Sequence, residues 1–553
     1  MHPSPGHRMY PERIPYLIDI PQIALGDLFV QAAARYGDRP ALSFGGRLWT
    51  YRALCDDAKA FAAALGDAGV AYGDRVAVML PNCPAFVIAY YGTLLAGGTV
   101  ALFNPMSVER EVAELLADAE PKVVVTLASL LPRVAASQPS QPKFAVLVQD
   151  GQTADGAGAS DLDAAHSSGS PEAPFGTIEF NMFLHRGQTR TFEPVAIQPT
   201  SDVATLQYTG GTTGKPKAAM LTHFNLVANV MQSATFYQDL YRPGEDVCLA
   251  VLPLFHAFGM TLCMNVSLYL GAKLVLLPKF EPQLVIRALR EERPTIFPGV
   301  PTMYTALLHM PDISAEDLGS IRMCISGGGP MPVEVMRAFE AKAGCTVLEG
   351  YGLSETSPIT HCNPPFAPRK EGTVGIAFPS TVCRLVSLDG STDEVAPGGV
   401  GELAVKGPQV MKGYWRAPEA TREVLHDGWF RTGDVARIDE DGYVSILDRK
   451  KDLIIASGYN VYPREIEDVL YGHPLIQEAL VVGVPDAYRG ETVKACIVLK
   501  AGARLTDLEL IDYCRSRLAP YKVPRIVEFR MELPKSAIGK LLRRALREEE
   551  STE

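Results

Sequence analysis

The sequence lacks the features that mark several protein classes. Its 553 residues carry a formal net charge of −11 rather than a basic excess, which argues against nucleic acid as the main partner. Its ten cysteines include no Cys-x-x-Cys pair, so we expect reduced thiols and neither a disulfide scaffold nor a zinc ribbon. The N-terminal stretch MHPSPGHRMYPERIP has no long apolar core, so we expect no signal peptide and a cytoplasmic location.

One uncharged stretch raises the question of a membrane span. Residues 247–272 contain no Asp, Glu, Lys or Arg and are long enough to cross a bilayer. Pro253, His256 and Gly259 interrupt the stretch, however, and divide it into strand, loop, helix and strand. We therefore expect a buried part of a parallel sheet instead.

Most of the chain alternates between short apolar strands and helices, and its length predicts more than one domain. A short strand pair is expected at Ala41–Tyr51, followed by a helix at Tyr51–Leu65 with Thr50 as its N-cap. Strands are then expected at Arg75–Leu80, Thr99–Phe103 and Val123–Thr126, with helices at Pro84–Ala96 and Glu109–Ala119 between them. This alternation predicts a large α/β domain of parallel sheets with helices on both faces. A stretch rich in Gly, Ala, Ser and Asp near 149–176 is expected to be a flexible surface insertion.

The pattern changes after Pro379. Short strands between Gly/Asp turns, among them Trp429–Arg431 and Val435–Ile438, predict a small β-barrel-like subdomain. Further on, a helix opened by Pro463 and a capping box at Thr506-x-x-Glu509 predict a compact α+β unit. We therefore expect an N-terminal domain at 1–447, a charged hinge linker at 448–452 and a mobile C-terminal domain at 453–553.

Residues 206–223, LQYTGGTTGKPKAAMLTH, predict a strand, a glycine–threonine loop and a second extended segment. Glycines let the backbone approach a polyanion, threonine hydroxyls and N–H groups can wrap its oxygens, and Lys217 adds charge. The loop is not a Walker loop, because the first glycine of that pattern would fall on Thr209 and its final hydroxyl on Pro216. We interpret it as a phosphate cradle, although composition alone leaves a surface loop open.

Two further stretches follow expected strands. Ser326-Gly327-Gly328-Gly329-Pro330 follows apolar residues 323–325, and bare backbone there would let a flat ligand lie close. The stretch EGYGLSET, residues 349–356, offers Tyr351 for stacking and the oxygens of Ser354 and Glu355, which are hard ligands of the kind that Mg²⁺ takes. A tight strand-to-helix turn at residues 326–330 and a solvated side chain for Glu355 remain alternative interpretations.

Two stretches nearer the C-terminus add charged residues. Asp434 in WFRTGD and the downstream Arg449 could grip a ribose diol between them, although an Asx turn and a surface arginine are commoner. Lys540 in PKSAIGK follows a glycine and would ordinarily be a solvated charge. It becomes interesting only if its domain can close over the cradle.

Together these stretches resemble the adenylate-forming superfamily of acyl-CoA synthetases, adenylation domains and firefly-type luciferases. YTGGTTGKPK, EGYGLSETSP, GWFRTGD, DRKKDLIIASGYNVYPREIE and PKSAIGK occur in the family's order over nearly the whole chain. LPLFHAFG and SGGGPMP are most similar to the bacterial long-chain fatty acyl-CoA synthetases. The resemblance implies that a fatty acid attacks ATP to give acyl-AMP and pyrophosphate, and that the acyl group then passes to coenzyme A.

The resemblance also implies residue roles. The β- and γ-phosphates of ATP would be held by Thr209, Gly210, Gly211, Thr212, Thr213, Gly214 and Lys217, with Thr209 and Glu355 near Mg²⁺. The rest of the nucleotide would be bound by Gly328, Gly329 and Tyr351 at adenine, Ser354 at the α-phosphate, and Asp434 and Arg449 at ribose, with Gly352 also among the nucleotide-binding residues. Lys540 would stabilise the charge that develops during adenylation, Lys451 would be the hinge, Gly458 would line the pantetheine path, and His256 would sit at the edge of the acyl pocket.

Several alternatives stay open. Some long-chain enzymes carry a gating Trp four residues after the histidine, but Met260 stands there, so the gate is assigned to neither His256 nor Met260. The substrate could be a medium-chain or aryl carboxylate, and the acyl acceptor could be a carrier protein. A non-catalytic nucleotide sensor is a further alternative, disfavoured because a sensor has no use for Lys540. Peripheral membrane contact and a homodimer are also left open.

Overall fold

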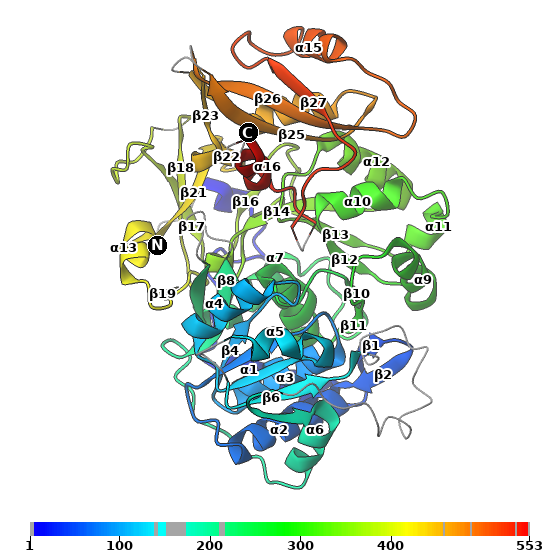
Figure 1. Ribbon diagram of the computed structural model, residues 1–553, viewed down its shortest axis with the longest axis vertical. Coiled ribbons are helices and arrows are strands. Elements are labelled where there is room, and N and C mark those ends of the chain that lie inside the picture. Colours follow the sequence, from blue (N-terminus) through cyan, green and yellow to red (C-terminus); the bar gives the residue numbers. More distant parts are fainter. Residues whose placement is uncertain are drawn as a thin grey trace.

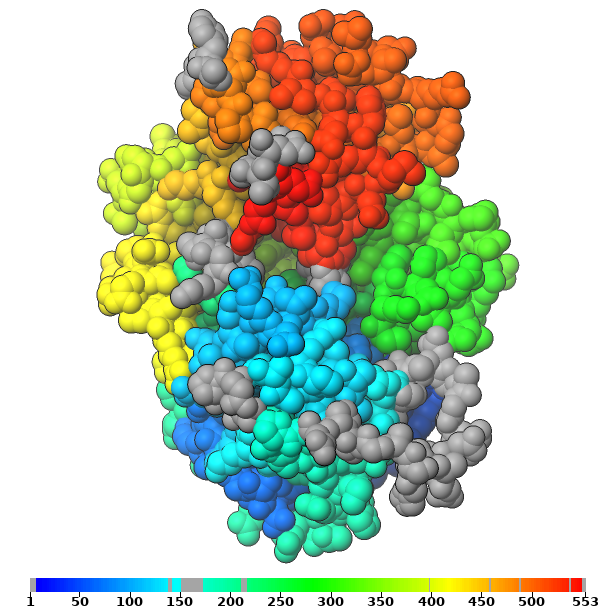
Figure 2. Space-filling view, in the orientation of Figure 1, coloured from blue at the N-terminus to red at the C-terminus, as the bar shows by residue number. Residues whose placement is uncertain are grey.

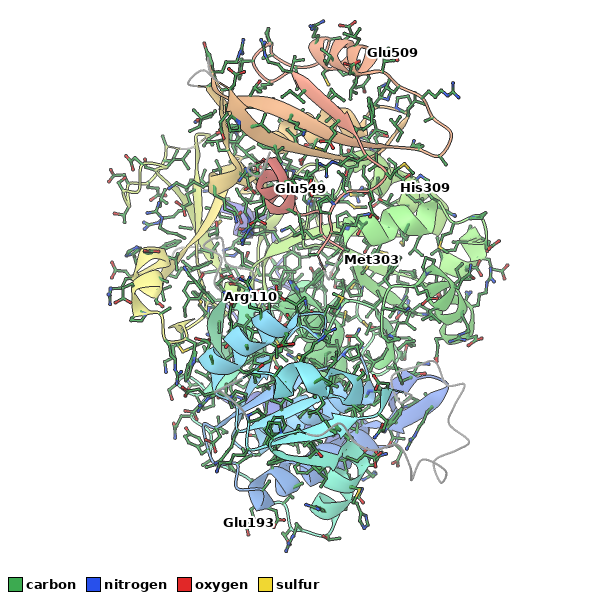
Figure 3. All side chains as sticks on the ribbon, in the orientation of Figure 1. Arg110, Glu193, Met303, His309, Glu509 and Glu549 are labelled. Atoms are coloured by element: carbon green, nitrogen blue, oxygen red, sulfur yellow. The ribbon has the colours of Figure 1, made fainter. Side chains whose placement is uncertain are left out.

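The computed structural model describes residues 5–137, 142–150, 173–209, 216–396, 398–456, 459–486, 489–536 and 539–550. The expected insertion lies mostly outside them, at 151–172. Figure 1 shows an N-terminal part built on large sheets and a C-terminal part, in orange and red, with a sheet of its own. In Figure 3, Glu193 and Glu509 mark the two ends of the long axis.

Two large sheets form the N-terminal part, as the βα alternation predicts. The nine-stranded sheet has the order β16 (Ile376–Ala377), β15 (Ile359–Cys362), β14 (Thr346–Gly352), β13 (Met323–Ser326), β12 (Ile296–Gly299), β10 (Val247–Ala250), β11 (Lys273–Leu276), β1 (Pro40–Phe44) and β2 (Arg47–Thr50). The eight-stranded sheet has the order β19 (Gly413–Tyr414), β9 (Lys217–Thr222), β8 (Val203–Thr209), β4 (Thr99–Leu102), β3 (Arg75–Met79), β5 (Val123–Leu127), β6 (Phe144–Val148) and β7 (Gly176–Glu179). Both are parallel in their centres and antiparallel at the edges that approach the site.

Helices cover and join these sheets. They are α1 (Leu25–Tyr36), α2 (Tyr51–Asp67), α3 (Pro84–Leu95), α4 (Glu109–Ala119), α5 (Leu131–Ala135), α6 (Phe180–Gln188), α7 (His223–Phe236), α8 (Ser267–Tyr269), α9 (Pro282–Glu292), α10 (Pro301–Leu308), α11 (Ala315–Leu318), α12 (Val333–Ala343) and α13 (Pro418–Val424). Short 3-10 turns are η1 (Pro5–Met9), η2 (Ala128–Leu130), η5 (Ser354–Thr356) and η6 (Lys450–Asp452). Every residue of α3 is buried, which explains why its sequence is apolar on all sides.

The uncharged stretch 247–272 is part of the core, as expected. It contains β10, the π-helix η4 (Gly259–Val266) and α8, and it leads into β11. The predicted helix is therefore a π-helix for most of its length, a difference that apolar composition could not reveal. Tyr91 of α3 donates a hydrogen bond to Asn265 of η4 at 2.7 Å and so links this stretch to its neighbours. Within the described ranges, no helix combines the length and the apolar composition that crossing a bilayer requires.

The β-rich part after Pro379 is an antiparallel sheet. Its strands are β17 (Val382–Val386), β18 (Val400–Lys406), β20 (Leu425–His426), β21 (Trp429–Ile438) and β22 (Val444–Arg449). β18 pairs with one edge of β21, and β20 and β22 both pair with its other edge. The described strands therefore form an open sheet, and the expected barrel-like ring is not formed. Trp429–Arg431 and Val435–Ile438 belong to one strand rather than two, because Gly433 adopts φ +74° within a bulge opposite β18 and the strand continues through it.

The C-terminal part has its own sheet and hydrophobic cluster. Its strands are β23 (Ile454–Ala456), β24 (Tyr459–Val461), β25 (Ile476–Asp486), β26 (Gly490–Leu499) and β27 (Ile526–Phe529), and its helices are α14 (Pro463–Tyr471), α15 (Asp507–Arg515) and α16 (Arg543–Glu550). Pro463 does open α14, and the capping box at Thr506 and Glu509 is present. The proposed linker 448–452 begins inside β22, because Asp448 and Arg449 pair with Val435 and Asp434. Figure 2 shows this part seated on the green segment that includes α9 to α12.

Candidate active site

Asp434 anchors one side of the candidate site. It lies opposite Arg449 in the β21–β22 ladder, and its Oδ1 is 3.0 Å from the Arg449 Nε. Tyr351, from β14 of a different sheet, donates its phenol to Oδ2 of Asp434 at 2.5 Å. Asp434 is only 2% exposed, so this carboxylate is fixed by two charged or polar partners. The two residues expected at ribose are therefore neighbours, and a residue expected at adenine joins them.

Tyr351 is half-buried rather than an exposed stacking ring. Burial and the neighbouring Asp434 carboxylate raise the pKa of its phenol well above the ordinary value, so the hydroxyl stays a donor at neutral pH. The sequence indicated a ring between two glycines but not the hydrogen bond that holds it. Since β13 and β14 are parallel neighbours, with Ser326 opposite Glu349, the residues that follow these two strands emerge at one sheet edge.

The glycines at this edge differ in what each requires. Gly328 has φ +78°, which favours glycine, whereas a Cβ on Gly329 would meet nothing within 4 Å. Gly327 packs against the Phe258 ring, 3.1 Å from where its Cβ would be. A Cβ on Gly352 would lie 2.0 Å from the carbonyl oxygen of Pro358. Gly329 therefore leaves open space for a ligand, while Gly352 is required by close backbone packing.

Glu355 lies in η5, next to Ser354, and η5 packs against the ends of β8 and β9. Its Oε1 accepts a 2.7 Å hydrogen bond from the hydroxyl of Tyr414, and its backbone carbonyl accepts one from the Met411 N–H at 2.8 Å. Among the described residues, Oε2 has no hydrogen-bond partner. One oxygen of this half-buried carboxylate is thus held, and the other remains available to a ligand.

Thr209 and Lys217 are the two ends of the expected phosphate cradle. They pair across the antiparallel β8–β9 ladder, and the Thr209 hydroxyl donates to the Lys217 carbonyl at 3.2 Å. The Lys217 Nζ lies 5.5 Å from the centroid of the Tyr414 ring. The residues between them that were expected to bind phosphate, Gly210, Gly211, Thr212, Thr213 and Gly214, lie outside the described residues.

Lys540 approaches the site from the C-terminal part. The preceding residue, Gly539, has φ +80°, and its carbonyl accepts a hydrogen bond from Thr302 of α10 at 3.0 Å. Although water reaches Lys540, the surrounding protein desolvates its ammonium, and together with the charge of Arg449 this lowers the pKa of Lys540 to about 8. The negative charge of Asp434 raises the pKa of Lys540 and so opposes these two effects. Lys540 thus lies in the electrostatic field of the Asp434–Arg449 pair.

His256 is half-buried near the start of η4. Its Nδ1 accepts a 3.3 Å hydrogen bond from the Phe258 N–H, which places the proton of the neutral ring on Nε2. Burial, followed by the positive charge of Lys540, lowers the pKa of His256 to about 4, so the ring is neutral at pH 7. Four residues on, Met260 is fully buried, and its Sδ accepts from the Tyr90 hydroxyl at 3.3 Å.

The expected hinge and pantetheine residues are only partly described. Lys451 is an exposed residue of η6, and its carbonyl accepts a 3.2 Å hydrogen bond from Arg547 of α16. Gly458 lies outside the described residues. Tyr414 was missed by the sequence reasoning, because a tyrosine in Gly413-Tyr414-Trp415 gives no local sign that it faces a carboxylate 59 positions away.

A metal ion at this site would need more ligands than Glu355 and Thr209 supply. In the part of the chain that the structure covers, no group of three or more His, Cys, Asp or Glu side chains could hold one. A lone carboxylate with a nearby threonine hydroxyl instead suits Mg²⁺ that arrives with phosphate oxygens. The free Oε2 of Glu355 and the position of Thr209 fit that arrangement.

Comparisons with known proteins identify an enzyme of the class that the motifs predict. Residues 29–415 match the model of the family described as AMP-binding enzyme, and residues 465–540 match its C-terminal domain. The chain belongs to this family, which confirms the predicted membership of the adenylate-forming superfamily and its α/β fold.

Relatives extend the match over nearly the whole chain. A Bacillus subtilis (strain 168) protein named long-chain-fatty-acid–CoA ligase is 45% identical over 546 residues, covering 98% of this chain and 97% of the relative. A feruloyl-CoA synthase of Amycolatopsis sp. is 37% identical over 527 residues, covering 95% of this chain and 98% of the relative.

A solved structure carries information on conformation. ATP-bound MatB from Rhodopseudomonas palustris is 32% identical, covers 95% of this chain and 99% of its own, and superposes with a TM-score of 0.84. The apo form of the same protein, with equal identity and coverage, gives 0.75. The arrangement of this chain is therefore more similar to the ATP-bound form.

Proposed function

We propose that the protein activates a fatty acid with ATP to acyl-AMP and pyrophosphate, and then transfers the acyl group to coenzyme A, giving fatty acyl-CoA and AMP. The observation that carries the proposal is that Arg449 and Tyr351 both hold Asp434, while the loop before Lys540 is fixed to the N-terminal part through the hydrogen bond from Thr302 to Gly539. The 45% identity to a relative named long-chain-fatty-acid–CoA ligase supports the substrate class.

In this proposal the nucleotide lies along the edge of the nine-stranded sheet. Asp434 accepts from the ribose hydroxyls, since its acceptor oxygens are already oriented by Arg449 and Tyr351. The adenine lies against Gly328 and Gly329, where the backbone leaves open space, with Tyr351 and Gly352 beside it. Ser354 reaches the α-phosphate, and Thr209 to Lys217 bind the β- and γ-phosphates that leave as pyrophosphate.

Lys540 supplies positive charge where the fatty acid carboxylate meets the α-phosphate. Negative charge is then spread over the phosphoryl oxygens, and a fixed ammonium in a partly desolvated site stabilises it more than water would. The similarity to the ATP-bound form of MatB supports the view that this is the arrangement for adenylation. No protein nucleophile is required, because the carboxylate itself attacks phosphorus.

Mg²⁺ would be held by Glu355, with Thr209 next to it, and the remaining ligands would be phosphate oxygens and water. When bound, the ion supplies charge neutralisation on the triphosphate. One oxygen of Glu355 accepts from Tyr414 and the other is offered to the ion. The ammonium of Lys217 lies over the ring of the same tyrosine.

For the second half-reaction we propose that the C-terminal domain, 453–553, rotates about the linker 448–452 with Lys451 as the hinge. Rotation withdraws Lys540 and brings the face that carries Gly458 to the path of the pantetheine. His256, neutral and oriented through its Nδ1, lies at the edge of the acyl pocket. A cytoplasmic location with peripheral membrane contact, and a homodimer, stay predictions.

An aryl or medium-chain carboxylate is the second candidate substrate, because the chain is also 37% identical to a feruloyl-CoA synthase. The deciding experiment is pyrophosphate release across carboxylates from acetate to oleate and benzoates, with and without coenzyme A. We expect release with long-chain acids and acyl-CoA formation only when coenzyme A is present. Preference for benzoates would favour the second candidate, and no acid-dependent release would favour a nucleotide sensor. Acyl-AMP that accumulates although coenzyme A is present would favour a ligase that loads a carrier protein.

A further inference from the structure

Tyr414 connects the two halves of the proposed triphosphate site. It ends the short strand β19, and its hydroxyl donates to Oε1 of Glu355 at 2.7 Å. Its ring lies under the ammonium of Lys217, with 5.5 Å from Nζ to the ring centroid. A single buried side chain therefore touches both the carboxylate expected near Mg²⁺ and the lysine at the exit of the cradle.

The backbone around Tyr414 is held from both sides. Lys412 N–H donates to the Met220 carbonyl at 3.0 Å and Trp415 N–H donates to the Ala218 carbonyl at 2.8 Å, so β19 is fixed along β9. On the other side, the Met411 N–H donates to the carbonyl of Glu355 at 2.8 Å. The Tyr414 N–H donates to Thr421 Oγ1 of α13 at 2.9 Å. The ring is therefore presented on a rigid segment, which is what precise positioning of another side chain requires.

The charges around the phenol favour the same role. The phenol is an O–H donor, and its 2.7 Å hydrogen bond to the Glu355 carboxylate satisfies one of the two carboxylate oxygens. A donor fixed on Oε1 leaves Oε2 as the oxygen free to meet a cation. It also limits the rotamers of Glu355, so less side-chain entropy remains to be lost when a ligand binds.

We propose that Tyr414 is a positioning residue that orients Glu355 toward the metal-bound triphosphate of ATP and holds Lys217 beside it. This inference rests on the proposed ATP-dependent function. It assigns a role to a residue that the phosphate cradle and the ribose pair do not include. The ligand chemistry is a magnesium polyphosphate, so the effect of Tyr414 should depend on the metal.

The test is equilibrium binding of ATP to the full-length protein, measured by calorimetry with excess Mg²⁺ and again with a chelator. Tyr414→Phe keeps the ring under Lys217 and removes only the hydroxyl. We expect it to weaken Mg·ATP binding about five- to tenfold, because a Glu355 side chain without its fixed donor loses more rotamer entropy when it meets the metal. Metal-free ATP binding should change less than about twofold, because Lys217 keeps its ring partner. Tyr414→Leu should weaken both.

The matched control is Tyr51→Phe, which removes another buried phenol, one that donates to the Ala272 carbonyl at 2.8 Å on the nine-stranded sheet. It should leave both affinities unchanged. Equal affinity of wild type and Tyr414→Phe for Mg·ATP would overturn the role of Tyr414 and leave the proposed function standing. Equal weakening with and without metal would overturn it too, since a general packing defect predicts that result. A wild-type protein that bound no ATP at all would instead refute the proposed function itself.

Discussion

Arg464 of α14 reaches into the N-terminal part and lies 3.5 Å from Glu349 of β14, and both side chains are largely buried. The same arginine donates to the Ile446 carbonyl at 2.8 Å, and its backbone N–H donates to Asp448 at 3.0 Å. Glu349 also accepts from the Met331 N–H at 3.2 Å. This ion pair ties the C-terminal domain to the strand that leads to Tyr351.

We predict that Arg464→Met destabilises the protein by about 3 kcal/mol near neutral pH, because it leaves the Glu349 carboxylate buried without its charge partner. The measurement is urea unfolding. In the double variant Arg464→Met/Glu349→Gln most of the loss should be recovered, since no buried charge remains. A double variant no more stable than the single one would contradict this explanation.

The penalty should also depend on pH. Burial raises the pKa of Glu349 above its ordinary value, and Arg464 opposes the rise. A carboxyl whose folded pKa lies above its unfolded pKa loses stability as pH rises through the folded value. Removal of Arg464 raises the pKa of Glu349 further. We therefore expect the destabilisation to be small near about pH 5 and larger near about pH 8. A penalty independent of pH would argue that lost packing alone is responsible.

Lys540→Ala should separate the two half-reactions. We expect acyl-AMP formation to fall by about a hundredfold or more, because charge on the α-phosphate loses its fixed counter-charge. Thioester formation from supplied acyl-AMP should change little. Pyrophosphate release and acyl-CoA formation, measured separately, check both statements, with Lys535→Ala as a nearby control whose lysine instead pairs with Glu478 at 2.6 Å. An equal fall in both half-reactions would refute the assigned role.

The pH profile of adenylation offers an independent check on Lys540. Because its pKa is lowered to about 8, its charge is present below that pH and lost above it. We expect kcat/KM for ATP in pyrophosphate release to decline as pH rises through about 8. Lys540→Arg, whatever its residual rate, should lack this decline since guanidinium stays charged. An unchanged decline in the arginine variant would assign it to another group.

Alanine substitutions at two glycines of the sheet edge, Gly352 and Gly329, should affect stability and ATP binding separately. Gly352→Ala should cost about 2 kcal/mol of stability, because its Cβ would lie 2.0 Å from the Pro358 carbonyl. Gly329→Ala should leave the thermal midpoint unchanged, since nothing lies within 4 Å, yet it should weaken ATP binding. Thermal unfolding with and without ATP measures both effects. Normal ATP binding by Gly329→Ala would remove this residue from the adenine site.

Local pattern was enough to predict most elements. The helix expected at Tyr51–Leu65 is present as α2, and Thr50 caps it by accepting from Ala53 N–H. The extent of β21 and the π geometry of η4 were not predictable, because a bulge at Gly433 and the wider turn of a π-helix both depend on packing against other segments. The same limit applies to the start of the linker, which the register of β22 decides.

The sequence by itself determined the family, the α/β architecture and which residue types stand at each motif, because these follow from local spacing and from motifs that each lie within one stretch of chain. Only the tertiary structure decided which motifs meet. Asp434 gains Tyr351 from another sheet, Glu355 gains Tyr414, and the pKa of Lys540 is lowered by desolvation and then by the charge of Arg449. These relationships join residues tens of positions apart, they are set by sheet order and domain packing, and local sequence carries no record of them.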